Sequence, residues 1–115
     1  EQVIPSAGQG IIALQCREGD EEIISVLNKT NHNETFMRAH VERSILKVLE
    51  GDCETAVGAH SIIKDDKIIV EAELFSLDGT KRFYEKKISK AENFSKIGIE
   101  VGQILKSKSN NSYKK

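Results

Sequence analysis

The clearest hydrophobic pattern in the chain is the alternation of apolar and polar residues in KIIVEAELF, residues 67–75. A period of two predicts a strand with one buried face and one largely wet face. β-branched runs predict two further strands, over residues 57–64 and 80–88. The short connections DD and SLDG are favourable turn sequences, so we predict antiparallel hairpins and a three-stranded sheet.

Three other segments repeat apolar residues every three or four positions, which predicts helices with one inward face. The first helix follows an N-cap at Asp20. The second runs from an N-cap at Asn33 over residues 34–50 and ends at Gly51, and the third starts at a capping box in residues 89–92. The predicted inward residues are Ile23, Ile24 and Leu27, then Met37, Val41, Ile45 and Val48, then Phe94, Ile97, Val101, Ile104 and Leu105. The predicted fold class is α+β, with the antiparallel sheet covered on one face by helices.

The two ends of the chain do not fit this domain. The run IIALQCR, residues 11–17, is typical of a buried strand but has no obvious partner in the sheet. The chain opens on EQVIPSAGQG without methionine, which favours a piece of a longer polypeptide whose upstream domain includes that strand. The polar sequence SKSNNSYKK at the other end is predicted to fray. We therefore divide the chain at residues 1–18, 19–106 and 107–115.

Composition excludes several classes of partner. Seventeen Lys and Arg residues oppose 18 Asp and Glu residues, so the net charge of −1 offers no general attraction to nucleic acid or an anionic membrane. No apolar run reaches the length of a transmembrane helix, and a signal peptide is absent from residues 1–20. The cytoplasm is the expected compartment, where Cys16 and Cys53 are expected to be unpaired thiols.

Two common kinds of site are disfavoured. The three histidines have no metal-like spacing to a cysteine or carboxylate, so no metal site is predicted. Residues 8–13, GQGIIA, match the dinucleotide pattern G-x-G-x-x-A. That pattern requires a strand before it and a helix after it, and the sequence predicts neither. The two glycines still allow a sharp bend or a close approach to a ligand.

Cys53 stands just beyond the second predicted helix in LEGDC, between the acidic residues Asp52 and Glu54. The helix C-terminus and these carboxylates disfavour a thiolate, so a catalytic nucleophile is not expected. Two interpretations remain: a small buried apolar residue, or a covalent anchor whose thioether is neutral once formed. The polar loop favours the anchor, because loops are usually exposed.

Arg43 lies three and four residues from His40 and Lys47, on the side of the second helix away from its apolar stripe. It fits either a solvated helix face or a clamp for carboxylate or phosphate, to which a guanidinium is well suited. Arg17, at the end of the first predicted strand, fits the same two descriptions. Spacing alone does not decide between them.

The sequence resembles the C-terminal part of the porphobilinogen deaminase (hydroxymethylbilane synthase) family over residues 4–105. The motifs that carry the resemblance occur in family order: IPSAGQGIIALQCR, NHNETFMRAHVERSILKVLEGDC and VGAHSIIKDDKIIVEAELFSLDGT. The resemblance implies that residues 1–18 end the first of three domains and that residues 19–106 form the third. The first and second domains would be the chain's missing partners, in a protein that is a monomer.

The resemblance also implies a transferase. The family condenses four porphobilinogen molecules into the linear tetrapyrrole hydroxymethylbilane and releases ammonia, with a dipyrromethane cofactor as primer. The cofactor is linked by a thioether to the cysteine of L-E-G-G-C, which corresponds to Cys53. Attachment adds the thiol to a strongly electrophilic carbon, so a depressed cysteine pKa is not required. The family's second glycine is Asp52 here, a carboxylate beside the anchor of a polycarboxylate cofactor.

By the same resemblance, Arg43 corresponds to a family arginine that handles acetate and propionate groups, with Arg17 as a weaker substrate-binding candidate. Gln9 and Gly10 correspond to a turn that borders the cofactor. The catalytic aspartate lies in a domain upstream of this chain, so the 115 residues alone are expected to be inactive. The alternative to this assignment is a stand-alone α+β binding domain in which Cys53 is structural.

Overall fold

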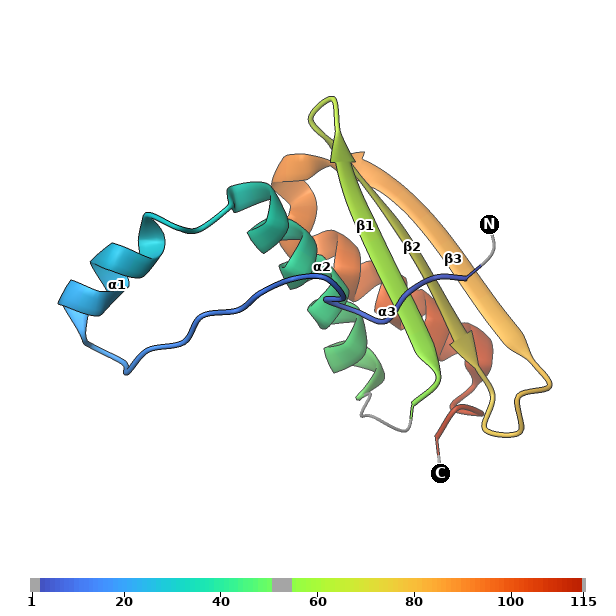
Figure 1. Cartoon of the computed structure of the whole chain (residues 1–115). Coiled ribbons are helices and arrows are strands. Elements are labelled where there is room, and N and C mark those ends of the chain that lie inside the picture. Colours follow the sequence, from blue (N-terminus) through green and yellow to red (C-terminus); the bar gives the residue numbers. More distant parts are fainter. Residues whose placement is uncertain (1–2, 51–54, 115) are drawn as a thin grey trace.

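The computed structural model of the protein describes residues 3–50 and 55–114 (Figure 1). The described residues form α1 (Glu21–Asn28), α2 (Asn33–Leu49), β1 (Val57–Lys64), β2 (Lys67–Phe75), β3 (Arg82–Lys90), a short 3₁₀ helix η1 (Ala91–Asn93) and α3 (Phe94–Ser109). None of the helices in these two ranges is long and apolar enough to cross a membrane.

The three strands form an antiparallel sheet in the order β1-β2-β3, which confirms the predicted α+β class. Asp65 and Asp66 join β1 to β2 with φ of 52° and 61°, the left-handed pair that a two-residue hairpin of type I′ requires. The predicted bounds of β1 and β2 are confirmed. β3 begins and ends two residues later than predicted. Its start is later because the Asp78 carboxylate binds the N–H and hydroxyl of Thr80 and keeps Thr80 in the turn. Its end is later because the pairing with β2 continues to Lys90, opposite Lys67.

Helices α2 and α3 cover one face of the sheet, as predicted (Figure 1). The core between them contains Val41, Ile45, Leu49, Ala59, Ile68, Val70, Ala72, Leu74, Ile97, Val101, Leu105 and Tyr113. The two helices approach each other closely at two glycines of α3. A Cβ atom added at Gly98 would lie 2.5 Å from the carbonyl oxygen of Val41, and one at Gly102 would lie 2.8 Å from the Cβ atom of Val48.

The ends of α2 differ from the prediction by one residue. His32, rather than Asn33, is the N-cap, because its side chain accepts a hydrogen bond from the N–H of Thr35. Glu50 takes the left-handed conformation that ends the helix, with φ of 56°. Gly51, which was predicted for that role, lies outside the described residues.

The capping box predicted in residues 89–92 does not form. Ser89 and Lys90 continue β3, and η1 separates the strand from α3. The Ser89 hydroxyl instead accepts a hydrogen bond of 3.1 Å from the side-chain amide of Asn93. Pairing with β2, in which Ser89 lies opposite Ile68, holds the backbone extended where the capping box needs a helix start.

Residues 11–17 do not form the predicted strand. They are extended but pair with no strand in the described part of the chain, and Ile12 and Leu14 are 88% and 62% exposed. The segment leads away from the domain to α1, which buries none of its residues (Figure 1). The radius of gyration is therefore 15.4 Å, compared with about 13 Å for a compact chain of this length.

Residues 4 and 5, which precede this extended segment, are hydrogen-bonded to the sheet. The carbonyl of Pro5 accepts a hydrogen bond of 2.8 Å from the N–H of Ala59, on the side of β1 that faces away from β2. The N–H of Ile4 donates to the buried carboxylate of Glu73. At Gly58 an added Cβ atom would lie 2.5 Å from the Ile4 carbonyl oxygen, so this close approach requires glycine.

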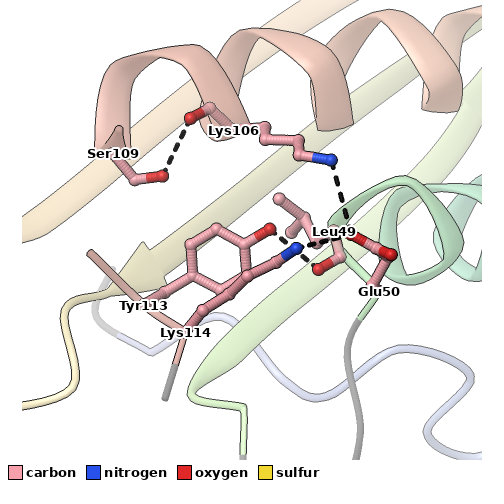
Figure 2. A network of polar contacts seen from close by, with 6 residues as sticks. All are labelled: Leu49, Glu50, Lys106, Ser109, Tyr113 and Lys114. Carbon is pink, nitrogen blue, oxygen red and sulfur yellow. Dashed lines mark hydrogen bonds and ion pairs between the residues drawn. The ribbon is translucent and has the colours of Figure 1, made fainter. Parts of the chain in front are cut away.

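The prediction of a frayed C-terminal tail is wrong for residues 107–114. Helix α3 continues to Ser109, and Tyr113 is only 3% exposed. Figure 2 shows the Tyr113 side chain directed at the end of α2, where its hydroxyl donates to the carbonyl of Leu49. A buried aromatic residue therefore holds a segment whose other residues are polar.

Candidate functional site

The turn of residues 8–10 exists because two of its residues are glycines. Gly8 and Gly10 have φ of 73° and 79°, in the left-handed region that other residues rarely adopt. The N–H of Gln9 donates to the Ser6 carbonyl and the N–H of Ile11 donates to that of Gly8, which closes two successive turns. Gln9 and Gly10 are exposed, so both are accessible on the surface of the turn.

A buried carboxylate fixes this turn to the rest of the domain. Glu42, on α2, is 3% exposed, and its Oε1 accepts a hydrogen bond of 2.8 Å from the N–H of Gly8. Its Oε2 accepts from the N–H of Ser61 at 2.9 Å and from the Ser61 hydroxyl at 2.7 Å. The same edge of β1 receives a hydrogen bond from Arg38, whose Nε donates to the Ser61 carbonyl at 2.6 Å.

Glu42 is a residue that sequence reasoning missed. The sequence analysis predicts a role only for the arginine of the triplet Val41-Glu42-Arg43. A charged residue is rarely fully buried unless it is paired or hydrogen-bonded, so burial of Glu42 is not expected. No sequence signal marks Glu42, because adjacent residues of a helix do not face the same side and its place next to the inward Val41 does not predict burial. The hydrogen bonds from Gly8 and Ser61, both remote in sequence, give the buried carboxylate the partners that burial requires.

Arg43 lies on the outer face of α2, where its side chain is exposed. It lines an open groove together with His40, Lys47 and Ile99. The His40 ring packs edge-on against Phe94 with 5.3 Å between ring centroids. The Arg43 guanidinium makes no hydrogen bond or ion pair with any residue that the structure describes, so its donors are available to an anionic ligand.

Arg17 occupies a different region. Its side chain is 91% exposed, and its guanidinium lies 4.0 Å from the carboxylate of Asp20. Asp20 is the predicted N-cap of α1 and accepts a hydrogen bond from the N–H of Ile23. Within residues 3–50 and 55–114, no hydrogen bond or ion pair connects Arg17 or Arg43 to the turn of residues 8–10. Direct contacts within the described residues therefore do not join Arg17, Arg43 and the turn into one site.

Cys53 lies outside the described residues, so its predicted role is carried by sequence alone. The other cysteine, Cys16, is a free thiol, as predicted, but it is exposed rather than part of a buried strand. In the two described ranges, no group of three or more His, Cys, Asp or Glu side chains is placed to hold a metal ion.

Comparison with known proteins identifies the chain's relatives. Residues 36–107 match the family described as "Porphobilinogen deaminase, C-terminal domain". The porphobilinogen deaminase of Desulforamulus reducens is 38% identical over 102 residues, which cover 89% of this chain and 33% of that protein. Those of Coxiella burnetii and Prochlorococcus marinus are 36% and 31% identical, covering 90% and 91% of the chain and 34% and 35% of each relative.

The chain therefore spans about one third of the length of these curated relatives. The family match alone includes more than half of the chain, from the first turns of α2 to near the end of α3. The chain belongs to the porphobilinogen deaminase family, and its residues 36–107 match the family's C-terminal domain.

Proposed function

We propose that this chain is the cofactor-anchoring part of a porphobilinogen deaminase, with dipyrromethane attached to Cys53 by a thioether. The observation that carries the proposal is the position of Cys53 in sequence. It follows the end of α2 at Leu49 and precedes β1 at Val57, inside the stretch that matches the family. The position after the C-terminal end of α2 and the acidic neighbours favour a neutral thioether over a charged thiolate.

The whole protein would condense four porphobilinogen molecules into hydroxymethylbilane and release ammonia, a step of tetrapyrrole and haem biosynthesis in the cytoplasm. Because this chain corresponds to one third of its relatives, that activity requires the remaining two thirds. The aspartate that manages protonation is expected there. The 115 residues alone are therefore proposed to be inactive.

The described residues suit a cofactor and a product that carry acetate and propionate groups. Arg43 offers an exposed guanidinium with no partner among the described residues, and Lys47 lines the same groove. Such groups bind carboxylates, and a guanidinium can do so with two parallel hydrogen bonds. Arg17 is a weaker candidate, since it already lies near Asp20. When bound, dipyrromethane supplies the primer to which pyrrole units are added.

The turn of residues 8–10 is proposed to border the cofactor. Its two left-handed glycines keep side-chain bulk away from the surface, while Gln9 and Gly10 remain exposed. The hydrogen bond from Gly8 to Glu42 holds the turn against α2, the helix that also carries Arg43. This provides a physical link between two of the proposed contact regions.

We also propose that residues 1–18 complete the first domain of the full protein, that residues 19–106 are the third domain and that residues 107–115 form its C-terminal segment. The extended residues 11–17, of which residues 12–17 are exposed, support the first assignment. Ile12 and Leu14 are exposed apolar side chains in a segment that has no partner strand in the described part of the chain. Pairing with a strand of the first domain would bury them.

The test is an intact-mass measurement on the full-length protein, followed by mapping of its cysteine peptides. We expect the mass of two linked pyrrole units on the Cys53 peptide, and loss of both this mass and activity in Cys53→Ser. Cys16→Ser is the matched control, because Cys16 is an exposed thiol in the same chain. Turnover retained by Cys53→Ser, or cofactor found on Cys16, would contradict the proposal.

A further inference from the structure

The C-terminal segment returns to the end of α2 and satisfies a group that the helix leaves unpaired. The last four carbonyls of a helix have no donor within it. At Leu49, the last residue of α2, the carbonyl accepts a hydrogen bond of 2.8 Å from the hydroxyl of Tyr113 (Figure 2). Tyr113 is 3% exposed, and its burial raises the pKa of the phenol, so the hydroxyl keeps its proton as donor.

Glu50, the residue that follows Leu49, is also contacted by the C-terminal segment. The Glu50 carboxylate pairs with the ammonium groups of Lys114 and Lys106, which come from the C-terminal segment and α3 (Figure 2). The hydrogen bond and charge of Lys114, followed by those of Lys106, lower the pKa of Glu50. Glu50 has φ of 56°, a conformation that is uncommon for glutamate and that these contacts help to hold.

The backbone conformation of the C-terminal segment brings Tyr113 to the end of α2. Asn110 and Asn111 have φ of 49° and 62°, and asparagine is one of the few residues that tolerate two such left-handed positions. The chain thereby reverses after α3. The Ser112 carbonyl then accepts a hydrogen bond of 3.0 Å from the N–H of Leu77, in the turn between β2 and β3.

We propose that Tyr113 and Lys114 are positioning residues: they hold Leu49 and Glu50 in place and so fix the point from which the chain continues toward Cys53. Cys53 follows Glu50 by three residues in the sequence and lies outside the described residues. Fixing Glu50 restricts the region that the cysteine can reach. This inference rests on the proposed function of Cys53 as the cofactor anchor.

The test compares Tyr113→Phe with Tyr84→Phe in the full-length protein prepared without cofactor. Tyr113→Phe keeps the buried ring and removes only the hydroxyl that binds Leu49. Tyr84→Phe is the matched control, because that hydroxyl donates to Glu71 on the sheet. The first measurement is the rate at which the Cys53 peptide gains the cofactor mass after porphobilinogen is added, at a temperature at which both variants are fully folded.

The second measurement requires no cofactor. Iodoacetamide alkylates exposed thiols, and the ratio of alkylation at Cys53 to that at Cys16 compares the two cysteines within one molecule. We expect Tyr113→Phe to slow cofactor incorporation about two- to tenfold, the range that one hydrogen bond represents. We also expect it to change the alkylation ratio, with Tyr84→Phe matching the wild type in both. Glu50→Gln, which weakens the pairs to the two lysines, should change both in the same direction.

The outcomes separate this inference from the proposed function. If the wild type gains no mass on Cys53, the proposed function fails and the positioning role fails with it. If the wild type is modified on Cys53 but Tyr113→Phe shows the wild-type incorporation rate and alkylation ratio, only the positioning role is overturned. A lower melting temperature with both measurements unchanged would show that Tyr113 is merely structural, which also overturns the positioning role.

Discussion

The carboxylate of Glu42 and the backbone N–H of Gly8 are joined by a hydrogen bond of 2.8 Å across a sequence separation of 34 residues. The other oxygen of the same carboxylate binds Ser61 on β1. One buried side chain therefore ties together the turn of residues 8–10, the middle of α2 and the outer edge of the sheet.

Replacing Glu42 by glutamine should destabilise the domain. The amide keeps the size of the side chain, but its NH₂ group must face an N–H donor of Gly8 or Ser61. A buried donor left without an acceptor costs about 1–3 kcal/mol in the free energy of unfolding, which urea denaturation of Glu42→Gln would measure. The control is Glu92→Gln, an exposed carboxylate with no hydrogen bond to the described residues. Equal stability of the two variants would contradict the role of Glu42.

Replacing Arg43 by alanine should impair catalysis while leaving stability nearly unchanged. An exposed side chain without partners in the described domain contributes within about 0.5 kcal/mol to folding. A charge-assisted contact to a substrate carboxylate corresponds to about a 10- to 100-fold loss in kcat/KM of the full-length enzyme. Arg43→Lys should fall between, because lysine keeps the charge without the bidentate geometry. Lys96→Ala, an exposed cation on α3, is the control; an equal loss there would contradict a specific role.

Gly98→Ala tests the close approach of α2 and α3. In an exposed helix this change is stabilising by about 1 kcal/mol, because alanine is the better helix former. Here the added Cβ atom would meet the Val41 carbonyl oxygen at 2.5 Å, so we expect a net destabilisation of about 1–3 kcal/mol. Thermal unfolding would show a lower Tm, while the control Ser95→Ala, on an exposed position of α3, should not. A higher Tm for Gly98→Ala would show that the helices can separate freely.

Asp78 should make the β2–β3 turn sensitive to acid. Hydrogen bonds from the hydroxyl of Ser76 and from Thr80 lower the pKa of the Asp78 carboxyl from 3.8 to about 2. Because the folded pKa is depressed, the stabilisation is present in full above about pH 4 and is lost as pH falls through 2. The stability difference between wild type and Asp78→Ala should therefore shrink across that interval, which denaturation at a series of pH values would measure. A constant difference from pH 5 to pH 2 would contradict the assignment.

Much of the fold could be predicted because its elements are periodic. The alternation in β2 and the stripe of Val41 and Ile45 in α2 each follow from one element and the face that it buries. The predictions are wrong where a single side chain shifts the start of a strand or a helix. Asp78 draws Thr80 into a turn, and His32 supplies the N-cap one residue before Asn33. Periodicity contains no information about such single hydrogen bonds.

The burial of Tyr113 and Glu42 was beyond the reach of sequence patterns. Tyr113 stands alone in a polar stretch, and its burial depends on the chain reversal at Asn110 and Asn111. Glu42 can be buried only because Gly8 and Ser61, from remote segments, donate hydrogen bonds to its carboxylate. The outward position of Arg43 was predicted correctly, since helix periodicity sets it. The roles of Arg43 and Cys53 as ligand contacts remain predictions.

The contact between Tyr113 and Leu49 also has a consequence for the order of folding, because it spans 64 residues of sequence. During synthesis, α2 and the β1–β2 hairpin emerge well before residue 113, so the Leu49 carbonyl must wait for its donor. Contacts between distant residues form late when the intervening chain must first be ordered. Docking of the C-terminal segment is thus expected to be among the final steps by which a newly made domain reaches its native state.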